Sequence, residues 1–355
     1  MSQDPAHGGG AGKNHGVLYI GIDLGTSRTS VAASNGVRET LPSFVGYPKD
    51  VVSQKLLKKE VLFGDEALSK RLSLNLFKPL EHGVLKCGEG GDADAEGNAR
   101  AARDLLLEAV RMVQPRSDEL VYAVIGAPAQ ASVQSKNAIV SVARDAVDSV
   151  MLCSEPFAVA YGQDMLEDVL VIDIGAGTVD LCRMHGTMPE ESDQITLTTA
   201  GDFVDQELAR LVREAYPQAQ FSDRMIKEIK ERNSTVAEVQ APILVELPVE
   251  GRPTEFDLTG PIRAACNAIV PPIVEGLGQL VSSFDPEFQH KLKERVLLAG
   301  GGSQIKGLDA AIEAEMERLL GSGRVLRIEE PMYGGANGAL KIAHDMPGEY
   351  WERLK

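Results

Sequence analysis

The sequence has few cysteines, no long aliphatic run and far fewer basic than acidic residues. Its four cysteines, Cys87, Cys153, Cys182 and Cys266, show no CxxC spacing, which argues against a structural zinc site or a disulfide framework. No aliphatic run approaches the roughly 20 residues that span a bilayer, and the N-terminus lacks the apolar segment of a secretory signal. We therefore expect a cytoplasmic protein without direct membrane insertion.

The shortage of positive charge limits the partners. The formal net charge is −16, which argues against nucleic acid as a partner. Only the segment VSQKLLKKEVLF, residues 52–63, concentrates lysines, and a solvated helix face is the favoured interpretation. With 355 residues and 43% hydrophobic residues, the chain is long and apolar enough for one large domain or two ordinary ones.

What the sequence does contain is an alternation of short aliphatic strands with helical stretches, which is typical of a mainly parallel sheet covered by helices. Strands are predicted over 17–23, 122–128, 150–156, 169–175 and 295–301, and helices over 98–114, 134–148, 205–214 and 260–284. Pro271 and Pro272 predict a break or kink in the last helix. Ligands of such sheets bind at the carboxyl ends of strands, where glycine, proline or a carboxylate follows each predicted strand.

Two segments repeat one pattern: IDLGTSRTS at residues 22–30 and IDIGAGTVD at residues 172–180. In each, an aspartate ends an apolar strand, and glycine then allows a tight turn whose amides can bind phosphate. Asp23 and Asp173 are candidates to hold a hydrated Mg²⁺. One such turn is weak evidence, but two matching turns predict a clamp that holds a polyphosphate from both sides.

Three further segments also carry structural predictions. VLLAGGGSQIKGL, residues 296–308, predicts a strand, a glycine-rich turn and a helix from near Ser303, which together form a candidate platform for a nucleotide base. The Gly-rich acidic stretch over 87–97 predicts an exposed loop. The strand-like segments within 239–260 predict a small accessory subdomain.

The order of these motifs resembles the actin, Hsp70 and sugar-kinase ATPase superfamily. Asp23–Thr29 and Asp173–Asp180 resemble its two phosphate motifs, and Gly300–Gly307 its adenosine motif. YAVIGAPA and GGANGAL, residues 122–129 and 334–340, resemble its two connecting segments. SEPFAVAYG, residues 154–162, and IKERN, residues 229–233, resemble bacterial actins in particular. SFVGYPKDV and the ending PGEYWERLK are similar to the magnetosome actins.

The resemblance implies an α/β actin-like ATPase fold with two duplicated RNase H-like halves around a nucleotide cleft, each with an accessory subdomain. The glycine content and polarity of residues 1–16 predict a flexible tail. The organisation implied for the rest is a first half over 17–165 with an accessory subdomain near 49–97, and a second half over 166–355 with one near 215–258. The segment from about residue 330 is expected to return to the first half.

The resemblance also implies a site for ATP or ADP with Mg²⁺. Glu155 is the implied catalytic residue, which orients the attacking water. Asp23 and Asp173 are the implied metal ligands. The implied nucleotide-binding residues are Gly25, Thr26, Ser27, Gly175, Gly177, Thr178, Gly201, Lys230, Glu231, Gly301, Gly302 and Ile305. Lys227 is a rival to Lys230, Arg28 either touches a phosphate or forms a surface salt bridge, and Asp180 is interpreted as a structural partner.

The implied function is an ATP-hydrolysing filament of copies of this chain, expected to organise magnetosomes together with magnetosome-associated proteins. A cell-shape or plasmid-segregating actin, an Hsp70-like ATPase and a small-molecule kinase remain as alternatives. The kinase alternative requires an acceptor site and a base, and no such group is evident besides Glu155.

Overall fold

The computed structural model describes residues 16–86 and 93–354. The predicted tail therefore lies outside the described residues except for Gly16, and the predicted loop over 87–97 lies outside them as far as residue 92. The rest of that loop is helical, because α3 spans Ala93–Met112. The prediction of a helix from Asn98 placed its start too late, since alanine alternates with acidic residues over 93–96, and acidic residues favour a first helical turn.

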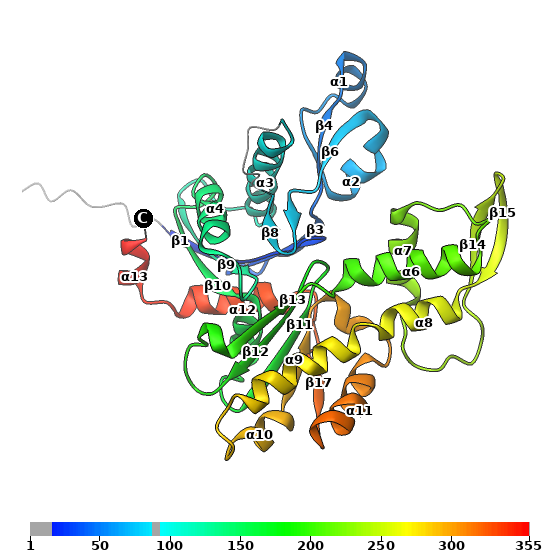
Figure 1. Ribbon diagram of the computed structural model, residues 1–355. Coiled ribbons are helices and arrows are strands. Elements are labelled where there is room, and N and C mark those ends of the chain that lie inside the picture. The colour runs from blue at the N-terminus through cyan, green and yellow to red at the C-terminus, as the bar shows by residue number, and fades with distance from the viewer. Residues whose placement is uncertain (1–15, 87–92, 355) are drawn as a thin grey trace, which may run out of the picture.

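Two five-stranded sheets form the two halves (Figure 1). Equivalent strands follow the same order in each sheet. The first contains β1 (Gly16–Leu24), β2 (Arg28–Ala33), β3 (Arg38–Pro42), β9 (Glu119–Ala127) and β10 (Ser149–Ser154). The second contains β11 (Val169–Ile174), β12 (Val179–Met184), β13 (Gln194–Leu197), β16 (Val296–Ala299) and β17 (Val325–Arg327). The first order is β10-β9-β1-β2-β3. The second, written in the matching direction, is β17-β16-β11-β12-β13.

The register shows that the halves are duplicates. β1 pairs antiparallel with β2 and parallel with β9, just as β11 pairs antiparallel with β12 and parallel with β16. Asp23 stands opposite Ser30, and Asp173 stands opposite Asp180. The predicted α/β class and its duplication are therefore confirmed.

Two helices lie between the sheets: α5 (Glu155–Gly162) and α12 (Gly334–Asp345). Glycines let α12 pack closely against α5 and against β1. A Cβ on Gly338 of α12 would lie 1.8 Å from the carbonyl oxygen of Ala158 in α5. A Cβ on Gly21 of β1 would lie 2.1 Å from the carbonyl oxygen of Ala336 in α12. After α12, the short α13 (Gly348–Arg353) stacks Trp351 on Tyr122 of β9, with ring centroids 5.0 Å apart. The C-terminal segment thus lies against the first half.

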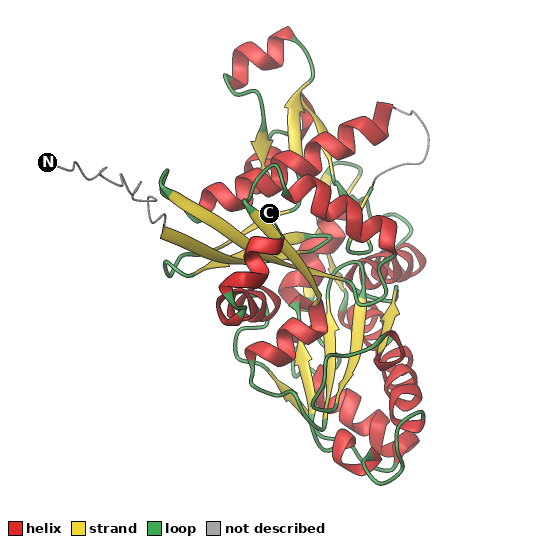
Figure 2. Ribbon diagram, turned by 90° about the vertical axis from the view of Figure 1, so that its left-hand side faces the viewer, coloured by secondary structure: helices red, strands yellow, loops and turns green. Residues whose placement is uncertain are grey.

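The outer faces of the sheets are covered by other helices (Figure 2). These are α3 and α4 (Val133–Ala143) on the first half, and α9 (Val270–Ser282), α10 (Gln289–Lys293) and α11 (Leu308–Leu320) on the second. Pro271 and Pro272 stand in the first turn of α9, directly after α8 (Thr259–Asn267) ends, so the predicted break is confirmed.

Within the described residues, Thr259–Ser282 is the one helical segment long and apolar enough to cross a membrane by length and composition. This differs from the expectation that no such run exists. However, 56% of its apolar window is buried inside the structure, and a core helix meets the same criteria. In the structure, α8 and α9 contribute Ile262, Ile273 and Leu277 to the core of the second half.

Each half carries smaller elements around its sheet. The first has β4 (Val45–Pro48), α1 (Val51–Leu57), β5 (Leu62–Phe63), α2 (Gly64–Ser69), β6 (Leu74–Phe77), β7 (Leu80–Glu81) and β8 (Val84–Leu85). The second has α6 (Gly201–Ala215), α7 (Asp223–Asn233), β14 (Leu244–Val249) and β15 (Arg252–Asp257). Single 3₁₀ turns occur at Arg71–Ser73, Glu191–Asp193 and Gly301–Gln304. We place the division between the halves in the connection from α5 to β11.

Candidate functional site

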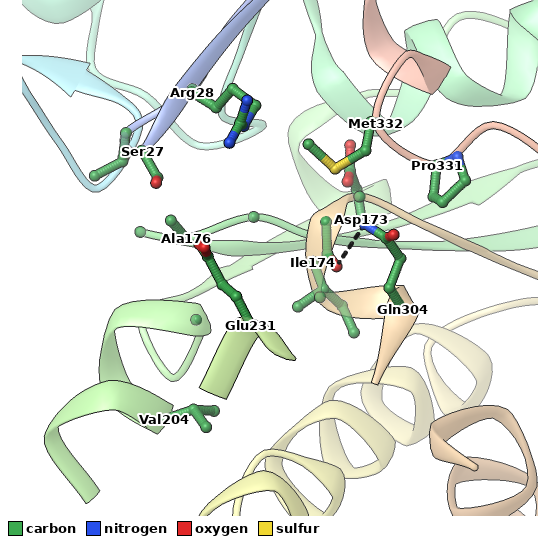
Figure 3. Close-up of a pocket in the computed structure, with 18 of the residues that line it drawn as sticks. Ser27, Arg28, Asp173, Ile174, Ala176, Val204, Glu231, Gln304, Pro331 and Met332 are labelled. Carbon is green, nitrogen blue, oxygen red and sulfur yellow. Dashed lines mark hydrogen bonds between the residues drawn. The ribbon is translucent and has the colours of Figure 1, made fainter. Parts of the chain in front are cut away.

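A cavity of about 410 Å³ lies between the halves and is lined by the turns that follow β1 and β11. Figure 3 shows Ser27 and Arg28 on one side of this space and Ala176 and Gln304 on the other. Every residue predicted for the site lines the cavity: Asp23, Gly25, Thr26, Ser27, Glu155, Asp173, Gly175, Gly177, Thr178, Gly201, Lys230, Glu231, Gly301, Gly302 and Ile305. The structure therefore brings all of them together.

The two glycine turns approach each other directly. A Cβ on Gly177, in the turn of the second half, would lie 2.4 Å from Thr26 Oγ1, in the turn of the first half. Within each turn the backbone folds back on itself, and the N–H of Gly175 donates to the carbonyl oxygen of Thr178 at 2.9 Å. Two loops of this kind, facing each other across a cavity, can hold one polyphosphate between them.

The tip of the β7–β8 hairpin closes this contact, and the sequence did not reveal it. The N–H of Gly83 donates to Thr26 Oγ1 at 2.7 Å, and His82 Nδ1 lies 3.0 Å from the carbonyl oxygen of Gly177. One hairpin thus contacts both phosphate turns. A His-Gly pair indicates a turn, but nothing local to it indicates which surface the turn will reach.

Three carboxylates of the cavity are held in an environment that disfavours their charge. Burial raises the pKa of Asp23 to about 6. Burial, followed by the charges of Asp180, Asp23 and Asp173, holds the pKa of Glu155 well above its ordinary value. Burial and the charges of Asp23 and Asp180 do the same to the pKa of Asp173. A bound cation would relieve this repulsion.

The donor set fits a hydrated Mg²⁺ better than a metal enclosed by protein ligands. Across residues 16–86 and 93–354, no group of three or more His, Cys, Asp or Glu side chains is arranged to hold a metal ion. Mg²⁺ commonly binds one or two carboxylates and takes waters and phosphate oxygens as its other ligands. Asp23 and Asp173, which lie beside the two phosphate turns, fit that pattern.

Asp180 is buried and bonded across the interface of the two halves. Its Oδ1 accepts hydrogen bonds from the N–H of Ala129 at 2.9 Å and from Thr196 Oγ1 at 2.6 Å. These contacts agree with the interpretation of Asp180 as a structural partner. Its Oδ2 is buried and has no hydrogen-bond partner among the described residues.

Two lysines of α7 have different contacts, although the sequence left them as rivals. Lys230 Nζ pairs with Asp205 Oδ1 at 2.8 Å and donates to the carbonyl oxygen of Gly201 at 2.8 Å. Lys227 donates across the cavity to Ser27 Oγ. Burial lowers the pKa of Lys227, and nearby acidic residues, with Glu231 first, oppose this effect. Both lysines therefore belong to the site.

The third glycine segment lies against the second phosphate turn. Gly300 has φ 77°, and a Cβ there would lie 2.3 Å from Asp173 Oδ1. The helix predicted from near Ser303 is wrong in its start, because Gly301–Gln304 form a 3₁₀ turn and α11 begins at Leu308. Gly307, with φ 76°, lies outside the helical region and delays the helix.

The MreB/Mbl protein family matches residues 18–347. The chain belongs to this family. The actin-like protein MamK of Paramagnetospirillum magneticum is 39% identical over 349 residues, which cover 98% of each chain. Among solved structures, a MamK double helical filament is 38% identical with a TM-score of 0.88, covering 93% of this chain and 99% of that one. A non-polymerising MamK mutant bound to AMPPNP is 37% identical with a TM-score of 0.70, covering 93% and 100%.

Membership of the MreB/Mbl family confirms the predicted actin-like fold. The same family match covers the three motif segments that line the cavity, from the first phosphate turn to Gly300–Gly307. Sequence reasoning found the residues that lie within these motifs. It missed cavity residues outside them, such as Val204, Pro331 and Met332, because a single apolar side chain gives no local sign of facing a ligand.

Proposed function

We propose that this protein is an ATP-hydrolysing bacterial actin that polymerises into cytoskeletal filaments. The observation that carries the proposal is the approach of Gly177 to Thr26, which makes one clamp from the phosphate turns of two halves. A site split between two halves changes with their relative orientation, so nucleotide state and subunit shape are coupled. This coupling is what a nucleotide-regulated filament requires.

Similarity to the filament subunit supports assembly. The chain superposes on a MamK double helical filament with a TM-score of 0.88, against 0.70 for the non-polymerising mutant with AMPPNP. The higher overall similarity to the filament subunit supports the assembly of this chain. Copies of this chain are therefore the proposed partner, stacked head to tail, because heterologous contacts that do not close produce open filaments.

The proposed reaction is ATP hydrolysis to ADP and phosphate. The amides and hydroxyls of Gly25, Thr26, Gly175 and Thr178 bind the phosphates from the two sides. Asp23 and Asp173 would hold Mg²⁺, which would supply charge neutralisation at the phosphates. The high pKa of Glu155 favours acceptance of a proton from the attacking water, and its place at the start of α5 orients that water.

Lys230, Glu231, Gly301, Gly302 and Ile305 are proposed to surround the adenosine. Ile305 is buried, which suits contact with a base. Gly301 and Gly302 line the cavity without a side chain, and Gly302 packs against Ile174, since a Cβ there would lie 2.2 Å from Ile174 Cγ2. Glu231 is exposed and suits a contact with hydroxyl groups at the edge of the cavity.

The proposed setting is the magnetosome chain, with magnetosome-associated proteins as further partners. This rests on the similarity to MamK. Imaging filaments in the source cell tests it. Filaments that run beside the magnetosome chain support the assignment, whereas filaments around the cell circumference indicate a cell-shape actin instead.

Sedimentation tests the filament proposal itself. The full chain is incubated with Mg²⁺ and ATP, ADP or no nucleotide over a range of concentrations, then pelleted and assayed for phosphate. We expect an ATP-dependent pellet above a critical concentration, with phosphate released after assembly. A protein that stays in the supernatant and monomeric at every concentration contradicts the proposal, and transfer of phosphate to a small-molecule acceptor would favour a kinase.

A further inference from the structure

Arg28 is a cation in the cavity that has no partner among residues 16–86 and 93–354. It is the first residue of β2, it lines the cavity, and its side chain is partly buried. In the part of the chain that the structure describes, no hydrogen bond, ion pair or cation–π contact engages its guanidinium. The surface salt bridge that the sequence left open is therefore not formed with any residue that the structure describes.

The other basic side chains of the cavity differ from Arg28. Lys227 is bonded to Ser27, and Lys230 is bonded to Asp205 and Gly201. Arg232 and Lys306 are exposed to solvent. A guanidinium that faces a cavity with its donors unused is suited to an anion, because its planar fork matches the oxygens of a phosphate or carboxylate.

The duplication of the fold indicates which part of the ligand Arg28 meets. Arg28 follows Asp23 by the same interval as Thr178 follows Asp173. The turns also match in space, since a Cβ on Gly25 would lie 2.6 Å from the carbonyl oxygen of Arg28, and one on Gly175 would lie 3.2 Å from that of Thr178. Arg28 therefore occupies in the first turn the place that Thr178 occupies in the second.

We propose that Arg28 binds the terminal phosphates of the nucleotide from the first half, opposite Thr178. This rests on the proposed function, because it assigns a further residue to the same site. In this conformation the Ser27 hydroxyl already accepts a bond from Lys227, so Arg28 supplies the charged donors of the first turn. The clamp is then asymmetric, with a hydroxyl from one half and a guanidinium from the other.

Binding of fluorescent ATP and ADP analogues tests the proposal below the critical concentration, with full-length wild type and with Arg28→Ala, Arg28→Lys and Arg28→Gln. We expect Arg28→Ala and Arg28→Gln to raise the Kd of the ATP analogue about tenfold to a hundredfold, the range of a lost charge-assisted bond. Arg28→Lys should recover part of this loss. Adenosine, used as a competitor, should bind wild type and variants equally because it has no phosphate.

Arg252→Ala is the matched control, since Arg252 is exposed on β15 and does not line the cavity. Thermal unfolding with Trp351 fluorescence checks that each variant is folded. An unchanged Kd for the ATP analogue in folded Arg28→Gln overturns the proposal, and so does an equal loss for adenosine. Failure of the wild type to bind any nucleotide would instead overturn the proposed function, so the two results are distinguishable.

Discussion

The N–H of Ala129 donates to Asp180 Oδ1 at 2.9 Å, and this bond ties the two halves together beside the cavity. Ala129 follows β9 of the first half, and Asp180 belongs to β12 of the second. The next residue extends the contact, because Gln130 Nε2 donates to the carbonyl oxygen of Gln194 at 3.0 Å and Gln130 Oε1 accepts from the N–H of Thr196 at 3.1 Å. The charge of Asp180 in turn raises the pKa of Glu155. The joint between the halves is therefore connected to Glu155, the residue proposed to be catalytic.

Replacing Gln130 by alanine should loosen this joint. Gln130→Ala removes both side-chain hydrogen bonds to β13, those to Gln194 and Thr196. We expect a loss of about 1 to 2 kcal/mol in the free energy of unfolding. The critical concentration for ATP-dependent assembly should rise severalfold, because the halves hold the filament orientation less firmly. Urea unfolding and sedimentation measure the two effects.

Asn35→Ala is the control for the Gln130 variant. Asn35 Nδ2 donates to the carbonyl oxygen of Val113 at 2.8 Å, a bond of the same kind that lies within the first half. It should cost comparable stability and leave the critical concentration unchanged. If the two variants shift assembly equally, the joint has no special part in it.

The joint also shows where sequence reasoning ended. Asp23 and Asp173 were predictable because their repeated motifs carry the chemistry within a few neighbouring residues, and Glu155 was predicted from the resemblance of its segment to bacterial actins. His82 contacts Gly177, and Gln130 contacts Thr196, over long intervals of sequence. Such pairs form only when the two halves come together. Neither a histidine nor a glutamine indicates from the sequence which residue of the other half it will contact. The start of α11 was missed for a local reason, the positive φ of Gly307, which a glycine permits but does not require.

Glu155→Ala should separate assembly from hydrolysis. Glu155 lines the cavity but lies outside the two phosphate turns, so the variant should still bind ATP and form filaments. Phosphate release should slow by about 100-fold or more, as expected for the loss of a general base. Sedimentation and a phosphate assay on the same sample test this, with exposed Glu349→Ala as control. Turnover at the wild-type rate would remove Glu155 from the mechanism.

Asp23→Asn should stabilise the protein when nucleotide and Mg²⁺ are absent. Burial raises the pKa of Asp23 to about 6 from an ordinary 3.8, so between these values the folded state binds more protons than the unfolded state. Stability contributed by this group is therefore lost as pH rises through about 6. At pH 7.5 the variant should gain on the order of 3 kcal/mol in the free energy of unfolding.

Urea unfolding at pH 5 and pH 7.5, followed through Trp351 as the single tryptophan, measures this gain. The advantage of Asp23→Asn should shrink at the lower pH, where wild-type Asp23 is protonated. Mg²⁺ and ATP should reverse the order, because the wild type alone has both carboxylates for the metal. Equal stability of the two proteins at pH 7.5 would show that burial of Asp23 costs nothing.

Gly177→Ala should abolish ATP-dependent assembly while leaving the two halves folded. The added Cβ would lie 2.4 Å from Thr26 Oγ1 and 2.8 Å from the Cα of His82, and the backbone of His82 cannot rotate away as a side chain can. The phosphate turns must then separate, which opens the clamp and weakens nucleotide binding at least tenfold, or by about 1.4 kcal/mol. Gly260→Ala is the control, since no atom lies within 4 Å of a Cβ there. Nucleotide titration and sedimentation compare the two variants, and wild-type assembly by Gly177→Ala would show that contact between the turns is not needed for the filament.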